Sequence, residues 1–217
     1  MSDFKALLRL QAFKELPPAI GAHMSIPKVQ VFVDGENLVM RYQALLEAGR
    51  KPRKGVVHIK DAFVWHPGLT TWSCMDIQRV TYYTSTTGDQ TKLRELKTKI
   101  ASTSFEFEHE FDHQIPKGSA QILPRVYHKP SKSRKTRNVD INIVIDMMRA
   151  AHTNSVELLL LYSGDGDYIP VIEECMRQGK IVWCCSFSSG LNPDLSSAVD
   201  LYEFLDETFF VKEKQNA

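Results

Sequence analysis

Two short acidic sequences each follow a run of apolar, β-favouring residues, and they are the first candidates for chemistry in this chain. The first is DGEN at residues 34–37, and the second is SGDGD at residues 163–167. In α/β folds with parallel sheets, ligands bind beyond the carboxyl ends of the strands. If the two strands are neighbours, Asp34 and Asp165 meet at one edge of the sheet. The adjacent glycines allow tight turns that leave these carboxylates uncovered.

A third carboxylate, Asp140, stands at the start of a predicted helix for which Asn138 is a reasonable cap. Carboxylates that lie close together in a poorly hydrated cleft repel one another, and each gains a proton or is displaced unless a cation compensates the charge. Oxygen ligands without nearby His or Cys suit Mg²⁺ or Mn²⁺ rather than zinc. Asp34, Asp140 and Asp165 are therefore predicted to hold such an ion, whose bound water attacks a phosphate.

Each of these acids also has a purely structural interpretation. Asp34 and Asp140 are favourably placed for the helix dipole at a helix N-terminus, and Asp167 is a plausible helix cap. Glu36 is a weaker candidate than its neighbours. Asp146 follows Asp140 by six residues, a spacing that turns it away from the same helix face, so we interpret it as structural or peripheral.

Predicted strands and amphipathic helices alternate from residue 28 onward. Strands are predicted at residues 28–33, 76–84, 104–110, 156–162 and 181–185, and helices follow most of them. The alternation predicts one α/β domain with a mainly parallel central sheet and helices on both faces. The helix that begins at Val139 is expected to turn Ile141, Val144, Ile145 and Met148 inward. Residues 49–74 are expected to be irregular, and residues 193–205 to form a helix or turns.

The bulk composition excludes several classes of protein. The chain has 217 residues, a net charge of +1 and ordinary apolar content, so it is neither a polycation nor a disordered tail. The four cysteines lack CxxC spacing, and three lie in apolar runs, which is typical of a reduced, cytoplasmic protein. No apolar run approaches the roughly 20 residues of a membrane span, so no membrane partner is expected.

Four segments in order resemble the NYN domain family, the PIN-like nucleases that include LabA-type proteins. They are VFVDGENL, VDINIVIDM, LYSGDGDYIPVI and LSSAVDLYEFLD, and the resemblance covers about residues 29–206. It implies a three-layer α/β/α, Rossmann-like fold and a metal-dependent ribonuclease site. By resemblance the site residues are the first-strand acid with its polar partner, the helix-start acid and the later acidic pair: Asp34, Asn37, Asp140, Asp165 and Asp167. Asp200 matches an acid that recurs near the end of the family's domain, for which a structural role is the alternative. Asn138 stands where the family often has Gly.

A basic segment runs directly into Asp140. Within residues 128–138 the cations are Lys129, Lys132, Arg134, Lys135 and Arg137, which are predicted to draw phosphates toward the acids. A second basic patch lies at residues 49–55. Ser163 is a candidate hydrogen-bond donor to a phosphate oxygen or a metal-bound water. The alternative for both basic runs is a solvated surface loop. His109 and His113 are expected to face solvent.

These observations favour a metal-dependent ribonuclease, an endonuclease that hydrolyses phosphodiester bonds of single-stranded or structured RNA with Mg²⁺ or Mn²⁺. One alternative is a weakly active or inactive RNA- or protein-binding regulatory module, with a protein partner or a homodimer. A phosphatase is disfavoured because DGEN lacks the second Asp of a DxD pattern. GAHM at residues 21–24 resembles a cloning remnant. We therefore expect a fused peptide or tag-derived segment at 1–24, the nuclease domain at 25–212 and a tail at 213–217.

Overall fold

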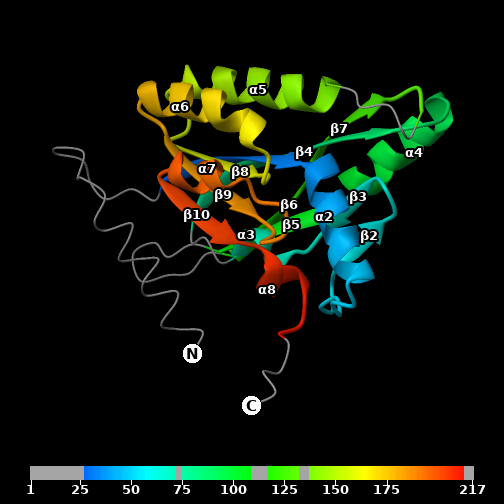
Figure 1. The fold of residues 1–217 in the computed structure, drawn as a ribbon. Coiled ribbons are helices and arrows are strands. Elements are labelled where there is room, and N and C mark those ends of the chain that lie inside the picture. Colours follow the sequence, from blue (N-terminus) through cyan, green and yellow to red (C-terminus); the bar gives the residue numbers. More distant parts are fainter. Residues whose placement is uncertain (1–26, 72–74, 109–116, 132–136, 213–217) are drawn as a thin grey trace, which may run out of the picture.

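The computed structural model describes residues 27–71, 75–108, 117–131 and 137–212 (Figure 1). The predicted N-terminal segment 1–24 and the tail 213–217 lie outside these ranges. So do His109 and His113, and the central part of the basic segment, residues 132–136. Among the described residues, no helix is long and apolar enough to cross a membrane.

The centre of the fold is a six-stranded sheet with the order β10-β9-β8-β1-β4-β7, in which every pairing is parallel. Its strands are β1 (Lys28–Asp34), β4 (Asp76–Thr86), β7 (Leu123–His128), β8 (Leu158–Tyr162), β9 (Ile181–Ser186) and β10 (Leu201–Phe204). The strands β1, β4, β8 and β9 were predicted and are confirmed. The edge strand β7 was not predicted, and β10 lies within residues 193–205, where the apolar pattern predicted a helix or turns. Edge strands bury less of their surface, and the apolar patterns of these two are correspondingly weak.

Helices cover both faces of the sheet, as predicted (Figure 1). On one face α5 (Asn138–Ala151), α6 (Ile169–Arg177) and α7 (Pro193–Ser197) pack with the apolar residues of β8 and β9. On the other face lie α2 (Gly35–Glu47), α4 (Gln90–Ala101) and α8 (Asp206–Phe209). Asp89 caps α4 by accepting the Lys92 N–H at 3.0 Å. The result is a three-layer α/β/α sandwich.

Helix α5 packs on the sheet with a face that only partly matches the prediction: Val144 and Met148 are partly buried against the core, as expected, but Ile141 and Ile145 are not turned inward. Val139, Ile143 and Met147 are fully buried, whereas Ile141 is 50% exposed and Ile145 is 39% exposed. The helix carries apolar residues on two faces, and helical spacing alone does not decide between them. The predicted cap is also wrong: helix α5 begins at Asn138, and in the described chain its cap residue, Arg137, makes no side-chain capping bond.

The segment expected to be irregular, residues 49–74, contains a short antiparallel hairpin of β2 (Val57–Ile59) and β3 (Phe63–Trp65), followed by α3 (Gly68–Thr71). Phe63 and Trp65 are fully buried, and the Phe63 ring lies 4.7 Å from the ring of Tyr82, centroid to centroid. Trp65 is therefore a core residue. Strands β5 (Ser104–Glu108) and β6 (Lys117–Gln121) form a second antiparallel pair.

Candidate active site

The two acidic turns lie side by side because β1 and β8 are adjacent parallel strands with Val33 opposite Tyr162. Asp34 is the last residue of β1 and also the cap of α2, since its carboxylate accepts the Asn37 N–H at 3.1 Å. The first residue of α2 must be a glycine, because a Cβ on Gly35 would lie 2.2 Å from the Tyr82 ring. The sharp turn therefore keeps Asp34 at the carboxyl edge of the sheet, where it is only 3% exposed.

Asp34 and Asp140 share one hydroxyl group. Ser163 Oγ donates to Asp34 Oδ2 at 2.9 Å, and the Tyr168 hydroxyl lies 3.3 Å from Asp34 Oδ2 and 3.3 Å from Asp140 Oδ1. The two carboxylate oxygens are thus at most twice that distance apart. A phenol has one hydrogen to donate, so it can satisfy only one of the two carboxylates at a time.

The pKa of Asp34 is raised from 3.8 to about 7 by its surroundings. Burial is the largest cause, the Asn37 N–H and the Ser163 hydroxyl act in the opposite direction and lower the pKa, and the charges of Asp140 and Glu36 raise it. Burial and the charges of Asp34 and Asp140 also raise the pKa of the Tyr168 hydroxyl well above its ordinary value, so it remains a donor. A nearby cation would stabilise the ionised form of an aspartate whose pKa lies near neutrality.

Asn37 connects the first acidic turn to the second. Its side-chain oxygen Oδ1 accepts the Gly164 N–H at 3.2 Å. Ser163 directly precedes Gly164. Its Oγ accepts the Asp165 N–H at 3.2 Å and donates to Asp34. Asn37 and Ser163 therefore fix the turn after β8 against the end of β1.

Asp165, and not Asp167, provides the cap that follows this turn. The Asp165 carboxylate accepts the Asp167 N–H at 3.0 Å at the start of the short 3₁₀ helix η1 (Gly166–Tyr168). The structural interpretation of Asp167 as a cap is wrong. Asp165 lines the same pocket as Asp34 and Asp140, whereas the exposed Asp167 is not among the described residues that line it.

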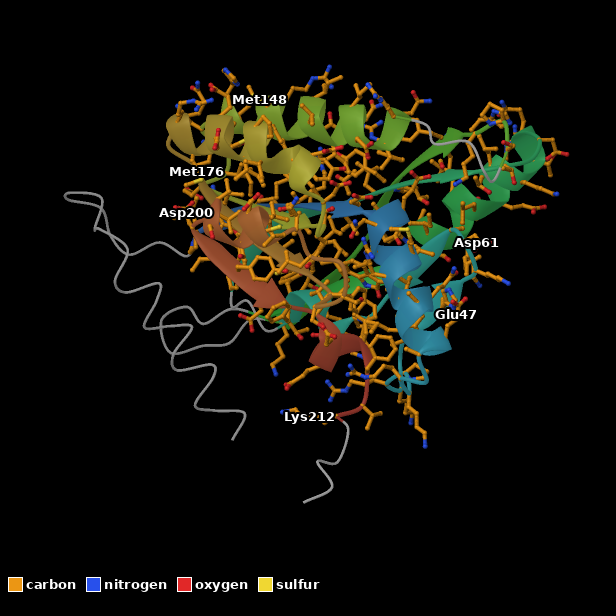
Figure 2. The ribbon with its side chains drawn as sticks, viewed as in Figure 1. Glu47, Asp61, Met148, Met176, Asp200 and Lys212 are labelled. Carbon is orange, nitrogen blue, oxygen red and sulfur yellow. The ribbon has the colours of Figure 1, made fainter. Side chains whose placement is uncertain are left out.

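The acids open into a pocket of about 800 Å³ that extends along α2. Asp34, Glu36, Asp140 and Asp165 line it, and Lys129 contributes a cation. Figure 2 labels Glu47, at the last turn of α2, and Asp61, in the turn between β2 and β3; both line the pocket as well. The acids are therefore at the N-terminal end of a longer groove.

Glu36 belongs to the site more closely than sequence reasoning suggested. Its carboxylate Oε1 accepts a hydrogen bond from Ser85 Oγ on β4 and lies 3.3 Å from Lys129 Nζ, just beyond β7. Ser85 and Lys129 lie 49 and 93 residues away from Glu36 in the chain, so the sequence around Glu36 carries no signal of these partners. The pair holds Lys129 beside the acids. Arg137, at the other end of the basic segment, is exposed, and Lys132, Arg134 and Lys135 between them lie outside the described residues.

The donor set fits a hard divalent cation of the Mg²⁺ type in an open site. The described residues contain no ready group of three or more His, Cys, Asp or Glu side chains able to hold a metal ion. Mg²⁺, however, is commonly bound by one or two carboxylates together with several waters. Asp34 and Asp140, joined at Tyr168, supply such a pair of oxygen ligands, and Asp165 lines the same pocket.

The remaining acids of the acidic motifs have structural partners. Asp146 accepts the Tyr83 hydroxyl at 2.8 Å and pairs with Arg149 at 3.1 Å. Asp200 accepts the Val182 N–H at 2.8 Å and so joins the segment before β10 to β9.

Three cysteines, Cys175, Cys184 and Cys185, are buried free thiols, as their apolar surroundings predicted.

Comparison with known proteins agrees with this architecture. A crystal structure of a protein of unknown function from Vibrio parahaemolyticus matches with a TM-score of 0.53 and 15% sequence identity, covering 88% of this chain and 99% of that chain. At this identity the likeness concerns the fold alone. No curated protein is significantly similar in sequence. Residues 28–206 match the NYN domain. The match spans most of the chain and confirms the resemblance seen in the four segments, so the chain belongs to the NYN domain family, whose members are generally nuclease-related.

Proposed function

We propose that this protein is a metal-dependent ribonuclease, an endonuclease that hydrolyses phosphodiester bonds in RNA. The observation that carries the proposal is the shared hydroxyl of Tyr168, which brings carboxylates from β1 and α5 together at the carboxyl edge of the sheet. Membership of a nuclease-related family supports the same activity. A buried carboxylate with a raised pKa beside a second carboxylate, as for Asp34 next to Asp140, is typical of functional sites.

Asp34, Asp140 and Asp165 would hold Mg²⁺ or Mn²⁺. Such an ion supplies positive charge for the scissile phosphate and acidifies a water for attack. The chain's own groups orient the ligands: Ser163 Oγ–H fixes one oxygen of Asp34, the Asn37 N–H fixes the other, and Tyr168 spans Asp34 and Asp140. Because these donors are held by the turn itself, they require little rearrangement when substrate binds.

Among the described cations, Lys129 is the one best placed to contact a phosphate next to the scissile bond. Glu36 holds its ammonium group at 3.3 Å, and the Lys129 side chain is 19% exposed. Arg137 is proposed to contact flanking phosphate oxygens, together with Lys132, Arg134 and Lys135 of the basic segment. Ser163, predicted to contact phosphate as well, is buried and donates its hydroxyl hydrogen to Asp34, so its role is to orient that carboxylate. Phosphate contacts of this kind position a strand without reading its sequence.

The experiment is cleavage of a mixed RNA pool by the purified protein with Mn²⁺ and with chelator, followed on a gel. We expect Mn²⁺-dependent cleavage by the wild type and a loss of roughly a hundredfold or more in Asp165→Asn, since a metal ligand is removed. A second readout is independent of activity: Mn²⁺ should raise the melting temperature of the wild type more than that of the variant.

Asp146→Asn is the matched control, because Asp146 lies on the same helix as Asp140 but is bound by Tyr83 and Arg149 outside the pocket. It should retain cleavage and the effect of Mn²⁺ on melting. Full activity in a folded Asp165→Asn protein would remove Asp165 from the site. Cleavage that persists in chelator would contradict the metal-dependent mechanism.

The second candidate is an RNA- or protein-binding module with weak or no activity. The absence of a ready three-ligand group among the described residues favours it. It predicts that the wild type binds RNA or a protein partner, that Mn²⁺ leaves the melting temperature unchanged, and that the RNA pool remains intact. The same two measurements therefore decide between the candidates.

A further inference from the structure

Two buried polar atoms beside the loop that follows β9 have no hydrogen-bond partner among the described residues. They are Nε of Arg41, on α2, and Oγ of Ser189, in the β9 loop (residues 187–192). Buried polar atoms in folded proteins are nearly always hydrogen-bonded, so an exception calls for an explanation such as a ligand that binds there. Arg41 and Ser189 are therefore candidates for a binding site other than the acids.

The guanidinium group of Arg41 lies directly against Gly190 in the β9 loop. A Cβ added to Gly190 would lie 1.9 Å from Arg41 Cζ and 2.3 Å from Arg41 Nε. Gly190 also has φ of 77°, in the left-handed region that favours glycine. The bare backbone of this glycine therefore forms a cradle for the guanidinium group. Because Gly190 is exposed and Arg41 is partly exposed, the group is accessible to an ion from solvent.

Arg41 has no carboxylate partner in the part of the chain that the structure describes. The acid that contacts the β9 loop, Asp206, is already engaged. It accepts the Ser188 N–H and the Ser188 hydroxyl, each at 2.8 Å, and lies 3.8 Å from Arg50. Charged groups that are removed from water are normally paired, so the partly buried guanidinium group of Arg41 lacks the counter-charge that an anion would supply.

The β9 loop is held in place by groups other than Arg41. Ser188 fixes its beginning to Asp206, and the Asn192 N–H at its end donates to the Gly164 carbonyl at 3.0 Å. The loop is therefore expected to keep its shape when the Arg41 side chain is shortened. A loss of binding in such a variant can then be assigned to the arginine itself.

The two unpartnered groups share the ability to donate hydrogen bonds. A guanidinium group has only donors, and a serine hydroxyl can donate one hydrogen. A metal ion does not fit this pair, because a guanidinium group has no lone pair with which to coordinate it. A phosphate group does fit, since guanidinium groups bind phosphate through two parallel hydrogen bonds and the phosphate has further oxygens for a hydroxyl.

The candidate site adjoins the acidic turns without being part of their pocket. Arg41 lies four residues beyond Asn37 on α2, which is about one helical turn. Asn37 accepts the Gly164 N–H, and a Cβ on Gly164 would lie 3.3 Å from the Gly190 carbonyl oxygen. Neither Arg41 nor any residue of the β9 loop is among the described residues that line the pocket of the acids.

We propose that Arg41 and Ser189 bind a phosphate group at the β9 loop, beside the pocket of the acids and outside it. The shared chemistry is that of a phosphate oxyanion, whether it is free, at the end of an RNA chain or within the chain. Only the last two sources rest on the proposed function.

The first test is binding of inorganic phosphate to the full chain in chelator, measured by isothermal titration calorimetry and by melting temperature. Acetate at matched ionic strength is the comparison anion. Phosphate should raise the melting temperature of the wild type more than acetate does. Arg41→Gln should weaken phosphate binding about tenfold or more, and Ser189→Ala should weaken it about two- to tenfold, since bonds to a charged donor are the stronger ones.

The matched control is Arg94→Gln, which removes an exposed arginine of α4 and should leave phosphate binding unchanged. Melting without phosphate verifies that each variant is folded. Arg41→Lys is the second variant, and it should also bind phosphate more weakly than the wild type because an ammonium group lacks the paired donors. Equal melting shifts in phosphate and acetate, or unchanged phosphate affinity in Arg41→Gln or Ser189→Ala, would overturn the proposal.

The second test identifies the source of the phosphate by fluorescence anisotropy in chelator. The probes are two RNAs of one sequence, labelled at the 3′ end, with a 5′-hydroxyl or a 5′-phosphate. We expect Arg41→Gln to weaken both RNAs alike, which identifies a phosphate within the chain. A loss confined to the 5′-phosphorylated RNA identifies a terminal phosphate. Unchanged binding of both RNAs, together with lost binding of inorganic phosphate, identifies free phosphate.

Failure of the inference is distinguishable from failure of the proposed function. Cleavage that requires Asp165 in a protein that does not bind phosphate through Arg41 would retain the nuclease and reject the phosphate site. Phosphate binding that requires Arg41 and Ser189 in a protein that never cleaves RNA would retain the site and reject the nuclease.

Discussion

Replacing Asp34 with Asn should make the protein more stable at neutral and alkaline pH, although Asp34 lies at the centre of the site. The carboxylate is buried, and its pKa is raised from 3.8 to about 7. In Asp34→Asn the amide oxygen can still accept the Asn37 N–H. The amide NH₂ group can donate to the hydroxyl oxygens of Ser163 and Tyr168, which rotate to accept. The substitution therefore removes a buried charge while retaining most of the hydrogen bonds.

The magnitude follows from the pKa shift. Because the folded state disfavours the ionised carboxylate, Asp34 lowers stability as pH rises from its unfolded value of 3.8 to its folded value of about 7. Below this window both states are protonated, and the residue has no effect. Each pKa unit corresponds to about 1.4 kcal/mol, so the full loss above the window is about 4 kcal/mol. Between about pH 5 and about pH 8, the variant should gain about 3 kcal/mol relative to the wild type.

The assay is urea unfolding of both proteins at these two pH values in chelator, so that no divalent ion compensates the charge. Comparing the two proteins at each pH cancels the titration of groups they share. A gain in Asp34→Asn that is small at the lower pH and several kcal/mol at the higher pH would support the reasoning. A variant that is less stable at both pH values, or a difference that does not change with pH, would refute it.

Two further predictions concern the neighbours of this group and the face of α5. Tyr168→Phe removes the hydroxyl shared by Asp34 and Asp140, so it should lower stability by about 1–3 kcal/mol at about pH 8 and by less at about pH 5, as measured by urea unfolding. An unchanged unfolding midpoint at the higher pH would contradict that role. Ile143→Ala should cost about 2–5 kcal/mol because Ile143 is fully buried, whereas Ile141→Ala should stay within about 0.5 kcal/mol. Equal losses in the two variants would show that α5 packs differently.

Much of the fold follows from local patterns. The continuous apolar run at residues 158–162 forms a central strand with every residue buried, and the spacing of Leu93, Leu96 and Ile100 forms the buried face of α4. The prediction that Asp34 and Asp165 meet at the carboxyl edge of neighbouring parallel strands is confirmed, since β1 pairs with β8 and both residues line one pocket. These patterns are informative because one strand or one helix face must be apolar to be buried, whatever it packs against.

Other features depend on contacts between distant segments. The faces of α5 that carry Ile141 and Ile143 are both apolar, and the sheet selects only the one with Ile143. The hairpin at residues 57–65 packs on the core because Phe63 lies beside Tyr82 and Trp65 lies edge-on to Tyr162. Neither outcome can be obtained from periodicity, because the choice depends on the shape of the surface opposite.

The sequence by itself determined the alternating strands and helices, the acids that follow β1 and β8, and the family. Only the tertiary structure decided that Tyr168 is shared by Asp34 and Asp140, that Glu36 holds Lys129, and that the pocket continues along α2. The physical reason is the range of the interactions. Strand and helix patterns arise between residues a few positions apart, whereas the site is assembled by packing of elements more than a hundred residues apart in the chain.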